Sequence, residues 1–230
     1  MTCITAQNTQ GVNRVDALPA AAVIAQIEAV VSDIGTQATK TGMLLNAEII
    51  QAVVSQVQGL KLEPLVVDPV MVSRTGDQLI DDQAVTSLRE DLIPLATIVT
   101  PNRYEAQLLS DLEIHTLDDM RRAAQHIYQL GANAVLVKGG AMTGDLCGVD
   151  VWFDGSQFYT LKTTLIETKN NHGTGCTLSS AIAANLAMGQ NPLTAVKNAK
   201  EYVTTALQYA LDMGQGYGPV GHFFPVLPSR

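Results

Sequence analysis

The chain has 230 residues, of which 47% are hydrophobic, 5% aromatic and 16% charged, and its net charge is −8. This length fits one domain that spans residues 1–230 and has an aliphatic core. The negative charge argues against nucleic acid or an anionic membrane surface as a partner, although backbone amides can hold a phosphate in an acidic protein. No apolar run is long enough to span a membrane, no secretory signal is visible, and the three cysteines follow no zinc or disulfide pattern. We therefore expect a cytoplasmic protein with free thiols.

Helical and strand-like segments alternate along the chain. Residues 18–33 are alanine-rich with helical apolar spacing, and residues 46–58 form a second predicted helix that starts at an asparagine suited to capping. Three short β-branched runs lack any alternation of polar and apolar residues, as in strands that are covered on both faces. These runs are residues 65–70, 97–102 and 134–140.

The second half of the chain continues this alternation. Thr116 and Asp119 have the spacing of a capping box, and Gly131 suits the C′ position of the same helix. Residues 150–161 place Asp-Gly between two alternating apolar runs, which predicts an antiparallel hairpin at the sheet edge. The last long helix opens at Asn191, followed by a proline at its first position. Together these elements predict an α/β fold with helices on both faces of a mainly parallel sheet.

Polar residues follow the three predicted buried strands. Asp68 follows the first, Thr100, Asn102 and Glu105 follow the second, and Lys138 follows the third. In open α/β sheets ligands bind outside the carboxyl ends of the strands, so these residues share one rim. Each also has a structural explanation: a strand end for the aspartate, a helix cap for the asparagine, a solvated position for the lysine. Their coincidence favours a ligand site.

The stretch "NNHGTGCTLSS", residues 170–180, places Gly173, Thr174, Gly175 and Cys176 directly before a predicted helix. Glycines let backbone N–H groups point inward, and a helix N-terminus attracts anions. A thiol at that position has a lowered pKa and can accept a proton from a substrate hydroxyl. A small buried side chain at a helix start explains Cys176 equally well.

Phosphoryl transfer requires a cation for the nucleotide phosphates, acids that hold Mg²⁺, and donors around the moving group. The chain contains these groups but no Walker A pattern. Six stretches resemble the ribokinase-like small-molecule kinases, and more narrowly the hydroxymethylpyrimidine/phosphomethylpyrimidine kinases of thiamine biosynthesis. These stretches are "MTCITAQNTQGV", "DPVMVSRTGDQL", "TPNRYEAQLL", "VLVKGG", "NNHGTGCTLSSAIAA" and "GYGPVGHF".

The resemblance implies a ribokinase-like three-layer α/β/α sandwich that uses ATP and Mg²⁺. Members phosphorylate 4-amino-5-hydroxymethyl-2-methylpyrimidine on its hydroxymethyl oxygen and then convert the monophosphate to the diphosphate. The resemblance also implies a homodimer. For this chain it implies Cys176 as the base, with Gly173, Thr174 and Gly175 forming the anion hole. The cysteine replaces the aspartate of most sugar kinases of this superfamily.

The resemblance assigns further roles by position. Gln7 and Met71 match contacts to the pyrimidine ring, together with Cys176. Asp68 and Glu105 match the network that holds Mg²⁺ and phosphate-bound water. Asn102, Thr100, Lys138 and again Glu105 match the nucleotide-phosphate end.

The sequence departs from the family pattern at its start. The family normally has a strand, an aspartate-containing glycine-rich loop and a helix before "TAQNT", so we expect this unit and one core strand to be missing. Two alternatives therefore remain besides the pyrimidine kinase. One is a pyridoxal or pyridoxine kinase of the same fold, and the other is a non-catalytic protein that binds a precursor.

Overall fold

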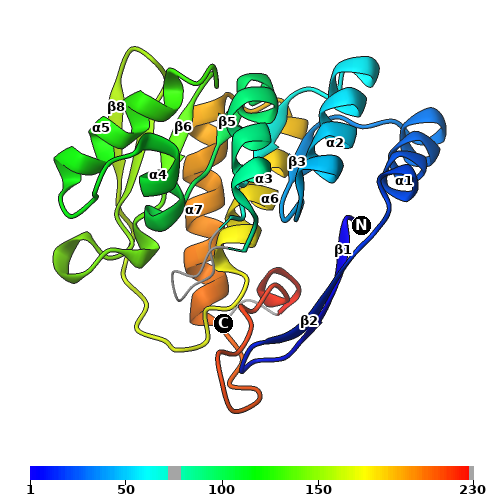
Figure 1. Ribbon diagram of the computed structural model, residues 1–230. Coiled ribbons are helices and arrows are strands. Elements are labelled where there is room, and N and C mark those ends of the chain that lie inside the picture. Colours follow the sequence, from blue (N-terminus) through cyan, green and yellow to red (C-terminus); the bar gives the residue numbers. More distant parts are fainter. Residues whose placement is uncertain (72–78, 228–230) are drawn as a thin grey trace.

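The computed structural model describes residues 1–71 and 79–227. Its centre is a six-stranded sheet with the order β3-β4-β5-β6-β7-β8, and a two-stranded antiparallel ribbon, β1-β2, lies outside that sheet (Figure 1). Strands β3 to β6 are parallel, whereas β7 and β8 form the predicted antiparallel hairpin at one edge. The strands are β1 (Cys3–Gln7), β2 (Val12–Ala17), β3 (Thr39–Thr41), β4 (Leu65–Val67), β5 (Ile98–Val99), β6 (Val135–Val137), β7 (Asp150–Phe153) and β8 (Phe158–Leu161).

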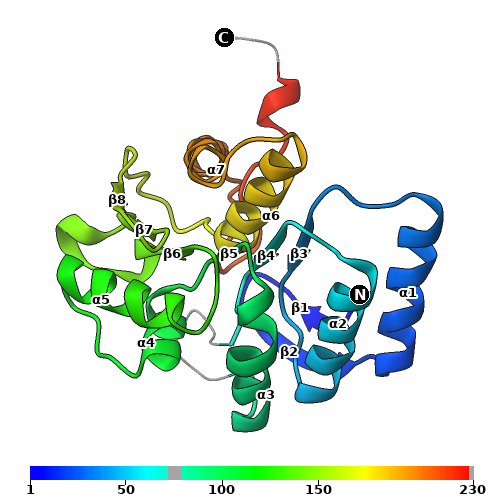
Figure 2. The same ribbon diagram turned by 90° about the horizontal axis from the view of Figure 1, so that it is seen from above.

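Helices cover both faces of the sheet, with α2 to α5 on one face and α6 and α7 on the other (Figure 2). None of the described helices is long and apolar enough to cross a membrane. The helices are α1 (Ala20–Asp33), α2 (Ala47–Leu60), α3 (Asp82–Ser87), α4 (Arg103–Ser110), α5 (Leu117–Tyr128), α6 (Thr174–Ala187) and α7 (Pro192–Gln208). Short turns are the π-helical η1 (Leu88–Leu92) and the 3₁₀ turns η2 (Ile93–Leu95), η3 (Gly139–Ala141), η4 (Gly144–Leu146) and η5 (Phe224–Val226).

Successive strand residues point to opposite helical layers, which explains why the strand sequences lack alternation. In β4, Val66 packs against α6 and α7, while Val67 joins the core beneath α2 to α5. Leu136 and Val137 divide in the same way in β6. Because both faces are covered, an apolar residue is favoured at every strand position. The predicted fold class is confirmed in this respect.

Side-chain caps fix most helix starts at the predicted positions. Asn46 accepts from the third backbone N–H of α2, and Asn191 caps α7 with a proline at its first position. Thr116 opens α5 with a complete capping box. Gly131 is displaced from its expected position: α5 ends at Tyr128 and Gln129 is its C-cap, so the glycine lies one position beyond C′. Its φ of +110° still requires glycine.

A groove of about 770 Å³ lies between the ribbon and the β3 edge of the sheet. Strand β1, helices α1 and α2, and the segment from β3 to residue 44 line it. Gln7, Lys40 and Met43 are among its lining residues. The buried hydroxyl oxygens of Thr39 and Thr41 also lie in this lining and have no hydrogen-bond partner among the described residues.

Residues 214–218 connect the ribbon tip to the loop before α6. The Tyr217 N–H donates to the Thr9 carbonyl at 2.8 Å, at the turn between β1 and β2. One residue later, the Gly218 N–H donates to Asn170 Oδ1 at 3.0 Å, and its carbonyl accepts from the His172 N–H at 3.0 Å. Figure 1 shows this red segment beside the blue ribbon.

Candidate active site

A buried ion pair joins the ends of β4 and β6. Lys138 Nζ lies 2.9 Å from Asp68 Oδ1, and both side chains are buried. Thr100 donates to the same oxygen at 3.4 Å, and Ser179 of α6 donates to Oδ2 at 2.9 Å. Burial alone would raise the pKa of Asp68, but Lys138 and Lys40 hold it below its ordinary range. Burial likewise opposes the charge of Lys138, and Asp68 raises that pKa again. The pair is therefore ionised at neutral pH.

Glu105 and Asn102 form a capping box at the start of α4, next to this ion pair. Glu105 Oε2 accepts from the Asn102 N–H at 2.7 Å, and Asn102 Oδ1 accepts from the Glu105 N–H at 3.0 Å. Burial raises the pKa of Glu105 to about 7, and the charge of Asp68 adds to the rise while Lys138 opposes it. The structural explanation of Asn102 as a helix cap is confirmed. Its main chain also pairs with that of Lys138, so it places the lysine as well.

The N-terminus of α6 presents free donors to the same region. Gly173 precedes the helix with a φ of +84°, and the Thr177 N–H closes the first turn on its carbonyl at 2.8 Å. The N–H groups of Gly175 and Cys176 have no partner in the part of the chain that the structure describes. A Cβ on Gly175 would lie 3.3 Å from Lys138 Nζ, so the glycine leaves room for the ammonium group. The Thr174 hydroxyl donates a hydrogen bond to the nearby Asn171 carbonyl at 2.6 Å. An anion placed here would meet two backbone donors and a lysine.

Cys176 is exposed and unpaired, but its pKa does not follow the expectation from the sequence. The pKa of the thiol is raised, first by partial desolvation among the surrounding groups and second by the negative charge of Asp68. Lys40 and Lys138 oppose that rise. The predicted lowering of the pKa is therefore wrong. The helix N-terminus suggested it, whereas the neighbouring carboxylate could not be placed from the sequence.

The carboxylates suit a Mg²⁺ ion that is contacted through water. The described residues hold no group of three or more His, Cys, Asp or Glu side chains able to bind a metal. Both oxygens of Asp68 already accept hydrogen bonds. Mg²⁺ keeps several waters and takes its other ligands from one or two carboxylates and substrate phosphates. Asp68 and Glu105 fit that arrangement better than direct coordination.

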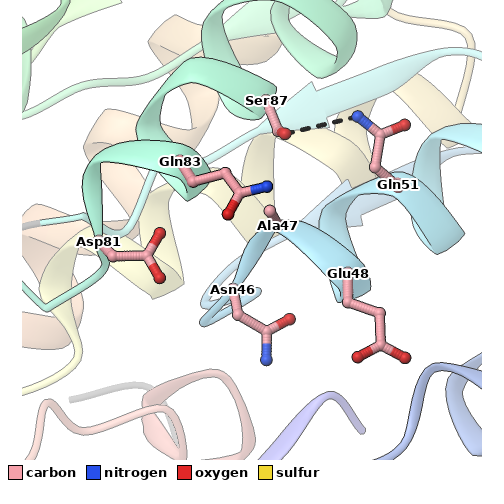
Figure 3. Close-up of a pocket in the computed structure, with 7 residues that line it drawn as sticks. All are labelled: Asn46, Ala47, Glu48, Gln51, Asp81, Gln83 and Ser87. Carbon is pink, nitrogen blue, oxygen red and sulfur yellow. Dashed lines mark hydrogen bonds between the residues drawn. The ribbon is translucent and has the colours of Figure 1, made fainter.

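A second pocket, of about 510 Å³, lies between the start of α2 and α3 (Figure 3). Asn46 and Asp81 line it but are occupied in capping these two helices. Gln51 donates to Ser87 at 3.4 Å across it. The other lining residues are Ala47, Glu48 and Gln83. None of the described residues that line this pocket is a cation or a thiol, so they do not supply the groups that phosphoryl transfer requires.

Comparison with known proteins identifies the family. The family model described as phosphomethylpyrimidine kinase matches residues 1–221. The chain belongs to the phosphomethylpyrimidine kinase family. It is 57% identical over 226 residues to the hydroxymethylpyrimidine/phosphomethylpyrimidine kinase of Synechococcus elongatus, covering 98% of this chain and 86% of that relative.

Solved structures agree with this family and with the predicted fold. A phosphomethylpyrimidine kinase from Clostridium difficile matches with a TM-score of 0.80 and 42% identity, covering 90% of this chain and 84% of that one. The ADP complex of a pyridoxal kinase from Bacillus subtilis matches with a TM-score of 0.88 and 35% identity, covering 97% and 84%. The resemblance seen in the sequence and the ribokinase-like three-layer sandwich are confirmed.

The structure adds two residues to the phosphomethylpyrimidine kinase site expected from the sequence. Met71 is buried in the core and Gln7 lines the groove, and their contacts to a pyrimidine ring stay predictions. Lys40 and Ser179 were missed, although both contact Asp68. Ser179 lies one helical turn after Cys176, which is a usable signal. Lys40 lies on a three-residue strand that is too short to predict. Residues 72–78 of the stretch "DPVMVSRTGDQL" lie outside the described residues.

Proposed function

We propose that this chain transfers the γ-phosphoryl group of ATP to the hydroxymethyl oxygen of 4-amino-5-hydroxymethyl-2-methylpyrimidine, and then a second one to the monophosphate. The supporting observation is that Cys176 and the free N–H groups at the start of α6 lie beside the buried pair of Asp68 and Lys138. A base, an anion hole and a fixed cation thus share one region. Family membership supports the same reaction in thiamine biosynthesis.

The chain's own groups divide the reaction between them. The acceptor hydroxyl attacks the γ-phosphorus, Cys176 takes the hydroxyl proton, and the bond between the γ-phosphorus and the bridging oxygen of ADP breaks. The N–H groups of Gly175 and Cys176 donate to the phosphoryl oxygens as charge shifts among them. Lys138 counters the charge that develops on the leaving diphosphate. Lys40 and Lys138 favour the thiolate and so increase the fraction of molecules able to accept the proton, against the opposing effects of desolvation and Asp68.

We propose that Mg²⁺ takes part, held by the nucleotide phosphates and, through water, by Asp68 and Glu105. Bound there, the ion supplies positive charge that neutralises the phosphate oxygens. Glu105 is suited to this role because it keeps a buried carboxyl group next to Lys138, and it loses its proton near pH 7. Asn102 and Thr100 support these two carboxylates. Asn102 caps α4, and Thr100 donates a hydrogen bond to Asp68.

We also propose a homodimer in a reducing cytoplasm. The ribbon exposes Ile4, Val12 and Val15, and a second copy would cover such a surface. The three cysteines are free thiols, which suits that compartment. Light scattering coupled to size-exclusion chromatography measures the mass directly, and a monomer at micromolar concentration would contradict the dimer.

A pyridoxal kinase is the second candidate, supported by the match to the Bacillus subtilis structure. Both acceptors are flat nitrogen heterocycles with a hydroxymethyl group. Only the pyrimidine requires a second phosphorylation, so ADP release with the pyrimidine monophosphate separates the two activities. If the chain binds the pyrimidine but releases no ADP in the presence of either acceptor, it is a non-catalytic binding protein instead.

The test of the proposed base is Cys176→Ala. Turnover with the pyrimidine should fall by about 10²-fold or more, the usual contribution of a general base. ATP affinity should hardly change, and Cys176→Asp should keep part of the activity. Cys147→Ala is the matched control, because Cys147 is another free thiol on a different loop. Wild-type turnover in Cys176→Ala would show that the thiol only packs.

A further inference from the structure

Two lysines reach Asp68 from different strands, and only one of them is fully engaged. Lys138 is buried and lies 2.9 Å from Oδ1. Lys40, from β3, lies 3.9 Å from Oδ2, an oxygen that already accepts from Ser179 at 2.9 Å. One fifth of the Lys40 side chain is exposed, and no hydrogen bond of its ammonium group is found within the described residues. Its three N–H donors are therefore available to a ligand.

Lys40 stands between the groove and the catalytic thiol. It lines the groove together with Gln7 and Met43. Its ammonium group lies 3.9 Å from Asp68 Oδ2, which also accepts from Ser179, one helical turn after Cys176. Its charge is among those that lower the pKa of the thiol. Gly42 makes this position accessible, because a Cβ there would lie 2.9 Å from Lys40 Nζ. The lysine thus links the groove to the buried pair of Asp68 and Lys138.

The two acceptors of the proposed reaction differ in charge at the reacting end. The first carries a neutral hydroxymethyl group, whereas the second carries a phosphate with nearly two negative charges at neutral pH. That phosphate would approach a region that already contains Asp68 and Glu105. Lys138 cannot offset it alone, since its charge is balanced by Asp68 at 2.9 Å. A second cation on the groove side would offset it, and among the described residues that line the groove Lys40 carries that charge.

We propose that Lys40 binds the phosphate of the monophosphate acceptor and so determines whether the second phosphorylation occurs. The proposal rests on the proposed function. One oxygen of the acceptor phosphate attacks the γ-phosphorus of ATP, the bond from that phosphorus to the bridging oxygen of ADP breaks, and ADP leaves. Lys40 donates to the other oxygens of the acceptor phosphate before and after transfer and keeps its own protons. Its role is to hold and neutralise this group.

The experiment compares the two acceptors in Lys40→Met, Lys40→Arg and the wild type. Lys162→Met is the control, because Lys162 is an exposed lysine just after β8. ADP release is measured separately with the pyrimidine and with its monophosphate, and a thermal melt checks folding. For Lys40→Met we expect kcat/KM with the monophosphate to fall about 10- to 100-fold, the scale of one charge-assisted hydrogen bond. With the pyrimidine the fall should be about 10-fold smaller than with the monophosphate, because there Lys40 acts only through the thiol, and Lys40→Arg should recover most of both losses.

Calorimetric binding of each acceptor without ATP separates this proposal from the proposed function. If the wild type turns over neither acceptor, the proposed function fails, and binding alone then tests Lys40. Weaker binding of the monophosphate to Lys40→Met, with unchanged binding of the pyrimidine, supports the proposal. Equal losses for both acceptors, no loss, or no binding of the monophosphate to the wild type overturns it.

Discussion

Helices α4 and α5 both begin with a reciprocal capping box, but the carboxylates of the two boxes lie in opposite electrostatic environments. In α4, Asn102 pairs with Glu105, which is only 2% exposed and lies next to Lys138 and Asp68. In α5, Thr116 is exposed and pairs with Asp119, whose partly buried side chain contacts the exposed Arg122. The hydrogen bonds are alike, at 2.7 and 3.0 Å in the first box and 2.9 and 3.1 Å in the second.

The pKa values of the two carboxyl groups move in opposite directions. Burial raises the pKa of Glu105 to about 7, whereas the hydrogen bond from Arg122 is the largest of several that hold the pKa of Asp119 below its ordinary range. The same sequence motif thus gives a structural cap in α5 and a titrating group in α4. Position decides the outcome: α4 starts at the carboxyl end of a central strand, where the ion pair of Asp68 lies.

The largest difference between the boxes should appear in the Mg²⁺ requirement of the kinase. Glu105→Gln keeps the acceptor for the Asn102 N–H but removes the charge. We expect the Mg²⁺ concentration for half-maximal ADP release to rise by about 10- to 100-fold, as for other groups that orient metal-bound water. The matched variant Asp119→Asn should leave it unchanged. An equal Mg²⁺ requirement in wild type and Glu105→Gln would show that α4 uses Glu105 only as a cap.

Stability as a function of pH should also separate the two boxes. The pKa of Glu105 rises from an ordinary 4.5 to about 7 on folding, so the folded chain holds this proton more tightly than the unfolded chain does. Its contribution is complete below pH 4.5 and is lost as the pH rises through about 7. One pKa unit corresponds to about 1.4 kcal/mol, so the free energy of unfolding should fall by a few kcal/mol as the pH rises through this range.

Glu105→Gln should remove that decline. Urea unfolding with a chelator present gives the free energy of unfolding of wild type and variant at about pH 5 and at about pH 8. The difference between the two proteins should change between these two conditions. A difference that stays constant between the two conditions would mean that Glu105 is already ionised near pH 5 in the folded chain.

A smaller effect is expected from the cap residue of α5. Thr116→Ala removes the side-chain acceptor of the Asp119 N–H and should cost about 1 kcal/mol of unfolding free energy. Thr116→Ser keeps the acceptor and serves as the control. The Michaelis constant for ATP should not move in either variant, because this box lies at the surface and away from the ion pair. A changed Michaelis constant for ATP would indicate that α5 contributes to nucleotide binding.

The smallest effect is expected from the charge of Asp119. Its pKa is lowered on folding, so its contribution is present above the ordinary value of 3.8 and disappears as the pH falls below it. Its partner Arg122 is exposed, and an asparagine keeps an acceptor for the backbone N–H groups, so Asp119→Asn should cost about 0.5 kcal/mol or less at neutral pH. The difference from wild type should shrink further in about 1 M NaCl, because salt screens exposed pairs. A difference unaffected by salt would indicate a hydrogen-bonding role rather than a charge effect.

Much of the fold could be predicted because local signals and tertiary packing agree. The capping residues, the hairpin at residues 150–161 and the three buried strands all appear at or near their predicted positions. Strand β3 was not predicted, because three residues are too few to show a hydrophobic periodicity. The capping box of α4 confirms the alternative explanation of Asn102 as a helix cap, whereas the ligand contacts that the resemblance implies for Asn102 and Glu105 stay predictions.

The site could be predicted only where position along a strand decides it. Asp68 and Lys138 follow from the rule that ligands bind at the carboxyl ends of parallel strands, and the structure brings them together. The raised pKa of Cys176 and the approach of Lys40 depend on contacts between segments far apart in the chain. The burial of Met71 has the same origin, since it depends on how the chain packs after β4.

The contacts of residues 214–218 set an order of events during synthesis. The loop before α6 completes its hydrogen bonds through Asn170 and His172 to Gly218, and the ribbon tip at Thr9 completes its own to Tyr217. Thr9 leaves the ribosome long before Tyr217 is synthesised. The hydrogen bond between them can therefore form only when nearly the whole chain has been translated. The loop that leads into α6 likewise gains its hydrogen bonds to Gly218 only after nearly the whole chain has been translated.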